Sequence, residues 1–197
     1  MNIKRALKRF IPNKLLPFLG VISNIDCENR RFLENDIFKY FNQSYGCSAD
    51  ALFIGVAPYT WHYSRLLDAN IHSIDINPAA AIFGVKNKTH VTGSVLRLSD
   101  YYPHDNFDFV IANGVVGFGV NDLVAFELML NEIGAVLKKN GLLLLGYNNT
   151  DAHLKFDINT YESSIFNQFS PSIVGFDRDV YVCDDEFDHE FRFFIKK

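Results

Sequence analysis

Residues 51–78, ALFIGVAPYTWHYSRLLDANIHSIDINP, constrain most strongly what this chain of 197 residues can fold into. The stretch opens with a short apolar run, residues 51–56, interrupted only by Gly55, and such a run is typical of a strand buried on both faces of a parallel sheet. Residues 61–69 carry apolar side chains at helical spacing, and residues 71–76 form a second apolar run. Strand, tight turn, helix and strand in this order predict an α/β fold.

An acid stands at the carboxyl end of the second predicted strand. Asp75 lies 20 residues after Gly55, a distance at which an acid binds the two hydroxyls of a ribose in proteins with this arrangement. Gly55 lets the backbone approach a ligand, and the first amides of the following helix would offer free donors. The pattern predicts a nucleoside-containing cofactor, whereas a purely structural βαβ unit is the plainer interpretation.

The turn after the first strand helps to choose among such cofactors. It contains one glycine, Gly55, where a dinucleotide fingerprint has three, so a pyrophosphate-containing cofactor is disfavoured. A cofactor without phosphate, such as S-adenosylmethionine, tolerates the missing glycines better. The turn continues with Tyr59, Thr60 and Tyr63. With these residues the stretch resembles the first two motifs of class I S-adenosylmethionine-dependent methyltransferases, in particular a group of small bacterial methyltransferase-domain proteins.

A second glycine-rich turn carries the same resemblance. Residues 107–112 predict a strand, and residues 113–119, NGVVGFG, follow at its carboxyl end. The small bacterial group has a similar N-G-V-x-G-[FW]-G motif at this place, although a loop built from three glycines is the alternative interpretation.

The resemblance implies a Rossmann-like class I methyltransferase fold. We expect a mostly parallel sheet of seven strands with helices on both faces and a C-terminal antiparallel hairpin. The hairpin is predicted at residues 180–183 and 191–195, where two β-rich segments flank an acidic link. We expect a basic N-terminal arm, residues 1–22, followed by a single methyltransferase-like domain, residues 23–197. The remaining elements are expected as helices over residues 24–45, 79–84, 96–102, 122–138 and 161–169 and strands over residues 89–92 and 142–145.

The resemblance also implies a set of residues that bind S-adenosylmethionine. Gly55 and Tyr59 would shape the methionine side, Asp75 would hold the ribose, and Asn113 and Gly114 would line the methyl-transfer mouth. Many relatives place an acid after the third strand, but this chain has Ser94 there, which would bond the adenine edge weakly. The full predicted set is Gly55, Val56, Ala57, Tyr59, Thr60, Tyr63, Asp75, Ile76, Ser94, Asn113, Gly114 and Val115.

Methyl transfer from a sulfonium needs mainly the in-line positioning of two atoms, so a catalytic base is optional. His62 and His153 are candidates for one, although a surface or packing role is the alternative for each lone histidine. Tyr147 and Asn148 follow the fifth strand and are expected to project toward the substrate.

No metal site is predicted. Asn113, Asn148 and Asn149 are neutral and poor Mg²⁺ ligands. The acidic link at residues 184–188, with His189 beside it, is interpreted as a solvated hairpin turn, with cation binding as the alternative.

Charge and cysteine content limit the class of partner and the location. The net charge of −4 argues against a general nucleic-acid binder, which would be basic. Three cysteines without a C-x-x-C pair fit a reducing compartment, and no secretory signal or membrane-spanning run stands out. The expected location is cytoplasmic.

The basic start of the chain adds one location hint. Residues 1–20 hold five basic residues and no acid, and Ile3, Leu7 and Phe10 fall on one helical face. The pattern is compatible with peripheral contact with the inner membrane surface. Because Pro12 and Pro17 shorten the helix, however, a short arm packed across the domain or a loosely ordered tail is the preferred interpretation.

The sequence therefore predicts an S-adenosylmethionine-dependent methyltransferase that acts on an oxygen or nitrogen of a small molecule or saccharide. Two alternatives stay open. One is a methyltransferase-like binding protein without catalysis, and the other is a nicotinamide-dependent oxidoreductase, against which the missing glycines and the terminal hairpin both argue.

Overall fold

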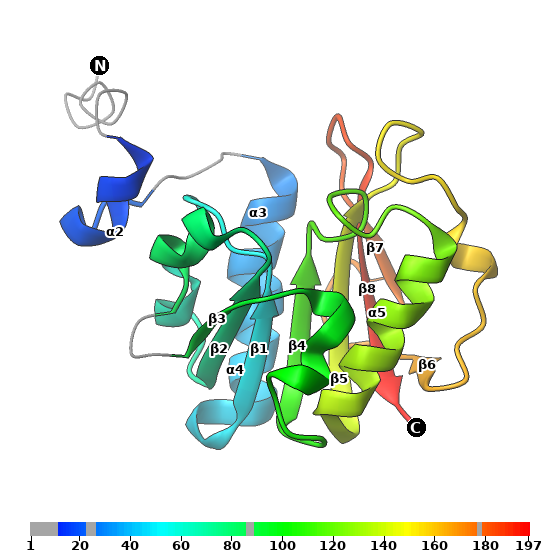
Figure 1. Cartoon of the computed structure of the whole chain (residues 1–197). Helices are drawn as coiled ribbons and strands as arrows, with labels where there is room; N and C mark the ends of the chain where they lie inside the picture. The colour runs from blue at the N-terminus through cyan, green and yellow to red at the C-terminus, as the bar shows by residue number, and fades with distance from the viewer. Residues whose placement is uncertain (1–11, 23–26, 86–88, 177–178) are drawn as a thin grey trace.

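The structure is a computed structural model that describes residues 12–22, 27–85, 89–176 and 179–197. Its centre is an eight-stranded sheet in the order β3-β2-β1-β4-β5-β8-β6, with β7 also paired to β8 (Figure 1). The strands are β1 (Asp50–Ile54), β2 (Asn70–Asp75), β3 (His90–Thr92), β4 (Phe107–Asn113), β5 (Leu137–Asn148), β6 (Phe166–Gln168), β7 (Val180–Val182) and β8 (His189–Lys196).

The sheet confirms the predicted mostly parallel architecture with an antiparallel C-terminal hairpin. Strands β1 to β5 pair in parallel, whereas β8 runs antiparallel to β5 and to its hairpin partner β7. The outer edge of β8 is covered in two pieces, because β7 pairs with residues 190–192 and β6 pairs with residues 194–196. This shared edge is why the sheet has eight strands instead of the predicted seven.

Helices cover both faces of the sheet, as predicted (Figure 1). One face carries a continuous helical segment made of α3 (Glu28–Phe32), a π-helical turn (Leu33–Ile37) and α4 (Phe38–Tyr45), and the other carries α5 (Leu123–Val136). Short helices make up the rest: α2 (Leu16–Leu19) and 3₁₀-helices at Asn13–Leu15, Gly46–Ser48, Tyr63–Arg65, Pro78–Phe83, Val95–Asp100 and Ile158–Thr160.

The buried strands divide the core between the two faces, because successive side chains of a strand point to opposite sides. Phe41 of α4 stacks on Phe109 of β4, with ring centroids 4.2 Å apart. The next residue of β4, Val110, belongs to the cluster on the other face, together with Phe126 and Met129 of α5.

The predicted helix over residues 61–69 is wrong. The structure has turns there and only a three-residue 3₁₀-helix, Tyr63–Arg65. Trp61 and its two successors are all buried, whereas a surface helix buries one face in every turn. The segment is also tied to α4, because Asn42 donates to the carbonyl of Leu66.

The predicted helix over residues 161–169 is wrong as well. A 3₁₀-helix at Ile158–Thr160 and strand β6 occupy this region. The Ser163 hydroxyl accepts from the amide of Phe166, and the amide of Phe169 bonds the carbonyl of Phe193 in β8. The segment therefore forms a strand that pairs with the free edge of β8.

The observed limits of several elements also differ from the predicted limits. Helix α5 ends at Val136 instead of residue 138, because Lys138 already belongs to β5 and bonds Asp108 at 2.8 Å. The predicted helices over residues 79–84 and 96–102 are 3₁₀-helices.

The predicted apolar face of Ile3, Leu7 and Phe10 lies outside the described residues. Across the described ranges, no helix is long and apolar enough to cross a membrane.

Candidate active site

The carboxylate of Asp75 is fixed at the carboxyl edge of the sheet by two backbone amides. Its Oδ2 accepts from the N–H of Val56 at 2.9 Å, and its Oδ1 accepts from the N–H of Asn77 at 2.7 Å. Gly55 makes this possible, because it turns the chain with a positive φ of 84° and bonds the carbonyl of Ile74. A carboxylate has about four acceptor positions, so Asp75 keeps room for two hydroxyl donors.

A cavity of about 170 Å³ begins at this acid. Gly55, Asp75, Ile76, Ser94 and Val115, five of the predicted cofactor residues, lie in its wall. Ile76 is 73% exposed, so an apolar surface stands directly beside the acid. The hydroxyl of Ser94 accepts from the amide of Leu96 and thereby caps the 3₁₀-helix that follows.

Three polar side chains meet next to this edge, at the ends of three strands. Asn113 ends β4, Asn148 ends β5 and His189 begins β8. The imidazole lies between the two amides, with Nε2 3.1 Å from Asn113 Oδ1 and Nδ1 2.7 Å from Asn148 Oδ1. Gly146, the partner of Asn113 in the ladder, leaves room for them, since a Cβ there would lie 2.2 Å from Asn113 Oδ1.

The buried amide of Asn113 offers a free donor. Its side chain is 6% exposed, and its Nδ2 has no hydrogen-bond partner among the described residues. An unpaired buried amide costs stability, so such a group is a candidate contact for a ligand.

The imidazole of His189 is neutral at physiological pH. Burial, together with the positive charge of Arg30 and against an opposing effect of Asp185, lowers its pKa from 6.5 to about 4. A neutral imidazole has one N–H, so it donates to one of the two neighbouring amide oxygens at a time.

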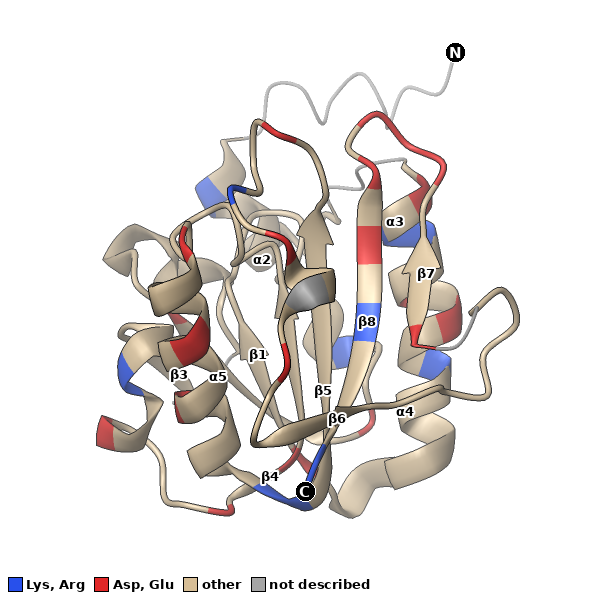
Figure 2. Cartoon of the chain, turned by 90° about the vertical axis from the view of Figure 1, so that its right-hand side faces the viewer, with Lys and Arg blue, Asp and Glu red and all other residues tan. Residues whose placement is uncertain are grey.

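Sequence reasoning misplaced His189, because it assigned the residue to a solvated turn. The turn between β7 and β8 is acidic and exposed (Figure 2), but His189 itself is 4% exposed. The available signal was the start of the last strand, which lies antiparallel to β5 and therefore brings its first residue opposite Asn148.

Comparison with known proteins rests on structure alone. No protein-family model matches the sequence, and no curated protein matches it. The N-methyltransferase NodS from Bradyrhizobium japonicum WM9 superposes with a TM-score of 0.63 at 16% identity, covering 85% of this chain and 96% of NodS. The complex of NodS with S-adenosyl-l-homocysteine gives a TM-score of 0.60 at 15% identity, over 94% of this chain and 99% of NodS. A TehB-like SAM-dependent methyltransferase from Corynebacterium glutamicum gives 0.59 at 15% identity, over 98% of this chain and 97% of that one.

The chain has the class I methyltransferase fold.

Within this methyltransferase fold, the turn after β1 is built from buried side chains. Thr60 Oγ1 accepts from the amide of Ala57 at 2.9 Å and so closes the turn. Tyr63 is 2% exposed, and its hydroxyl accepts from Arg30 at 3.2 Å. The same guanidinium lies 4.5 Å from the ring centroid of Tyr59. These groups shape the turn, and their direct contact with a cofactor stays a prediction.

The candidate histidines, His62 and His153, have other recorded partners than the cluster of Asn113, Asn148 and His189. His62 is 3% exposed, and its Nε2 lies 3.6 Å from Glu34 Oε1, which is a packing position. His153 Nδ1 lies 2.9 Å from the hydroxyl of Thr150, and its ring lies 5.1 Å from that of Phe118 in the loop after β4.

Tyr147 does not project toward the substrate, contrary to the prediction. Side chains alternate along β5, so Tyr147 points to the face opposite Asn148 and is 1% exposed. Its hydroxyl donates to Glu190 at 2.6 Å and accepts from Arg192 Nε at 2.8 Å. Burial and the carboxylate of Glu190 raise the pKa of this hydroxyl, so Tyr147 stays protonated and serves the core.

Proposed function

We propose that the protein is a class I methyltransferase that uses S-adenosylmethionine to methylate an oxygen or nitrogen of a small molecule or saccharide. The observation that carries this proposal is the carboxylate of Asp75, fixed by two backbone amides beside the positive-φ turn at Gly55 and the cavity of Ile76 and Val115. This is the arrangement that a ribose with an attached base requires.

The residues present fit such a cofactor. Asp75 would accept the ribose hydroxyls, and the exposed side chain of Ile76 would pack on the base. Small-molecule pockets commonly measure about 300–1,000 Å³. The cavity of about 170 Å³ is smaller than this and suits only the nucleoside part of the cofactor. The open edge at Gly55 and Gly114 would face the remaining part of the cofactor. When bound, S-adenosylmethionine supplies an electrophilic methyl group.

The residues at the mouth would orient the methyl acceptor. Asn113 Nδ2 offers a hydrogen-bond donor, and the neutral ring of His189 holds the Asn113 amide in place. A mouth made of two amides and a neutral imidazole suits an uncharged hydroxyl or amine. NodS carries the name N-methyltransferase, which supports a nitrogen acceptor here.

The turn after β1 argues against a dinucleotide. In the described residues that follow β1, turns and a three-residue 3₁₀-helix replace the α-helix whose N-terminus binds a pyrophosphate in dinucleotide enzymes. The small cavity favours one other candidate, a protein of this fold that binds a nucleoside without catalysis.

Calorimetric titration with S-adenosylmethionine and S-adenosyl-l-homocysteine tests the proposal. We expect micromolar binding that is lost in Asp75→Ala and kept in Asp151→Ala, which removes an exposed acid elsewhere. Absence of binding by the intact protein would refute the cofactor assignment. Binding without transfer of labelled methyl groups to an extract of small molecules would favour the non-catalytic candidate.

We further infer peripheral contact of the N-terminal arm with an anionic membrane surface. In the described part of the arm, the side chains of Leu15, Phe18 and Leu19 are 46%, 71% and 58% exposed, with Lys14 beside them. Flotation with anionic vesicles tests this, and we expect the variant Phe18→Ser/Leu19→Ser to float less.

A further inference from the structure

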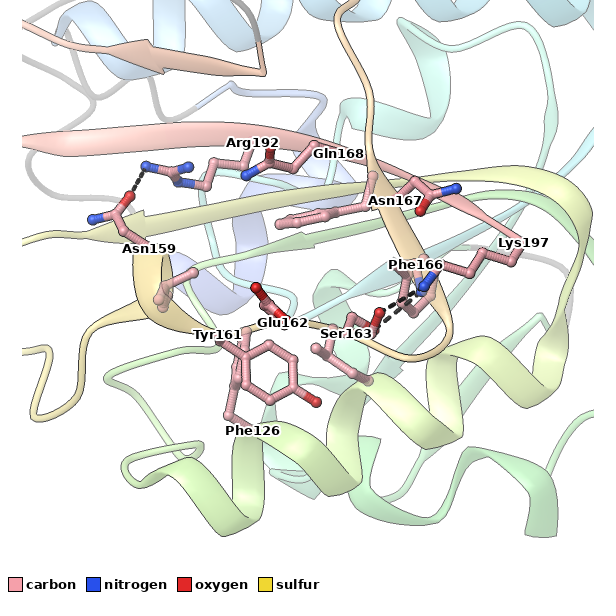
Figure 3. A pocket seen from close by; sticks show the side chains of 13 residues that line it. Phe126, Asn159, Tyr161, Glu162, Ser163, Phe166, Asn167, Gln168, Arg192 and Lys197 are labelled. Atoms are coloured by element: carbon pink, nitrogen blue, oxygen red, sulfur yellow. Dashed lines mark hydrogen bonds between the residues drawn. The ribbon is translucent and has the colours of Figure 1, made fainter.

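A second cavity lies on the α5 face of the sheet, and it shares no lining residue with the cavity at Asp75. It has a volume of about 400 Å³ and is enclosed by α5, by residues 158–163 and by the outer strands β6 and β8 (Figure 3). Its volume falls within the range of about 300–1,000 Å³ that is usual for small-molecule pockets.

Aromatic rings form the inner part of this groove. Phe126 and Phe166 are buried, whereas Tyr161 and Phe194 are partly exposed and present ring surface to the cavity. Phe126 and Tyr161 contact each other edge to face, with ring centroids 5.3 Å apart, which fixes the Tyr161 ring.

Polar side chains surround the rings. Glu162, Asn167 and Gln168 are exposed and line the groove, and within the part of the chain that the structure describes their side chains make no hydrogen bond. In Figure 3, the carboxylate of Glu162 lies between the ring of Tyr161 and the side chain of Gln168. The groove therefore offers both donors and acceptors to a ligand.

The two cations that line the groove, Arg192 and Lys197, both have partners within the protein. Arg192 is 7% exposed and bonds Asp179 at 3.2 Å and Glu190 at 3.1 Å, so two carboxylates offset its charge. Asn159 also bonds this guanidinium. Lys197 Nζ donates to the carbonyl of Ser163 at 2.8 Å. Both cations among the described lining residues are thus engaged within the protein, and the carboxylate of Glu162 disfavours an anion in the groove.

We propose that this groove binds a neutral saccharide. A pyranose ring has apolar C–H faces that pack on aromatic rings such as Tyr161, and a rim of hydroxyls that both donate and accept hydrogen bonds. Amide groups at Asn167 and Gln168 and the carboxylate of Glu162 match that rim. The proposal stands independently of the methyl-transfer site, because it rests on different residues.

Titration by NMR tests the proposal. Cellobiose, maltose and N,N′-diacetylchitobiose are each added to the full-length ¹⁵N-labelled protein, and the side-chain amide signals of Asn159, Asn167 and Gln168 are followed. We expect saturable shifts at millimolar concentration for at least one disaccharide. Tyr161→Ala should weaken that binding at least tenfold, Tyr161→Phe should retain it, and Glu162→Gln should weaken it several-fold. Glu186→Gln, an exposed acid in the β7–β8 turn, should leave it unchanged.

Three results would overturn the proposal. One is the absence of shifts with every disaccharide up to about 20 mM, which corresponds to a binding free energy weaker than about −2.3 kcal/mol. Another is binding that Tyr161→Ala leaves intact. The third is tighter binding of inorganic phosphate or tetramethylammonium than of any disaccharide, which would show a charge-selective site instead.

Discussion

Single residues decide the chemistry of the mouth, and Gly146 is the least obvious of them. No left-handed backbone requires a glycine there, since the positive-φ glycines lie elsewhere among the described residues. The requirement is space, because Asn113 Oδ1 and His189 Nε2 occupy the position where a Cβ would stand, at 2.2 and 3.1 Å.

Gly146→Ala should therefore destabilise the protein. Overpacking of this kind costs about 1–3 kcal/mol, and we expect that loss in the free energy of unfolding measured with urea. The double variant Asn113→Ala/Gly146→Ala removes the clashing amide, so it should lose less than the sum of the two single changes. Strict additivity would show that the amide is not what excludes the methyl group.

His189 should make stability depend on pH. Its pKa is about 4 in the folded protein and near 6.5 when it is exposed by unfolding. Between these values only the unfolded chain binds the proton, so the free energy of unfolding should fall as pH drops from about 6.5 to 4, by up to about 1.4 kcal/mol per pH unit.

Urea unfolding at pH 7, 6 and 5 measures this dependence. His189→Gln should flatten it, whereas the exposed His104→Gln should not. Equal slopes for the two variants would contradict a buried, neutral His189.

At the scale of elements, β8 connects the two proposed sites. Its first residue, His189, faces the mouth, and Arg192 reaches the groove on the other side of the sheet. Between them, Glu190 bonds Tyr147 of β5 and Asn149 beyond it. The buried network of Arg192, Glu190 and Asp179 fixes β8 against its neighbours.

Arg192→Leu should destabilise the fold by about 3–5 kcal/mol, because it leaves Glu190 and Asp179 buried without their cation. Arg192→Lys should recover only part of that loss, since an ammonium cannot reproduce the forked contacts of a guanidinium. Thermal unfolding of the three proteins measures the effect. Full recovery by lysine would mean that charge alone, and not geometry, matters at this position.

Elements also show where pattern reasoning fails. The parallel strands and α5 were predictable, because long apolar runs and strong periodicity reflect burial directly. Residues 61–69 and 161–169 were predicted as helices, but neither segment forms an α-helix. Their conformations depend on partners far along the chain, namely Asn42 for the first and the edge of β8 for the second.

At the scale of the whole molecule, ligand binding and folding are linked. A ligand present at 100 times its dissociation constant stabilises the folded state by about 2.7 kcal/mol, which corresponds to about 5–10 °C in the melting temperature of a chain of this size. We expect S-adenosyl-l-homocysteine to give such a shift and NAD⁺ to give none. A larger shift with NAD⁺ would favour the oxidoreductase alternative. The shift should vanish in Asp75→Ala and persist in Asp151→Ala.

The sequence by itself determined the order of the parallel strands and the position of Asp75 at the carboxyl end of β2. Burial on both faces makes parallel strands visible as apolar runs, and a turn with its glycine and acid is local, so Gly55 and Asp75 could be found from spacing alone. Tertiary structure alone decided which side chains lie together at the proposed methyl-transfer site. Asn113, Asn148 and His189 come from three strands, and only the antiparallel insertion of β8 beside β5 brings them together. The alternation of side chains along β5 likewise turned Tyr147 into the core and Asn148 toward the site, because a change of one residue in register reverses the face.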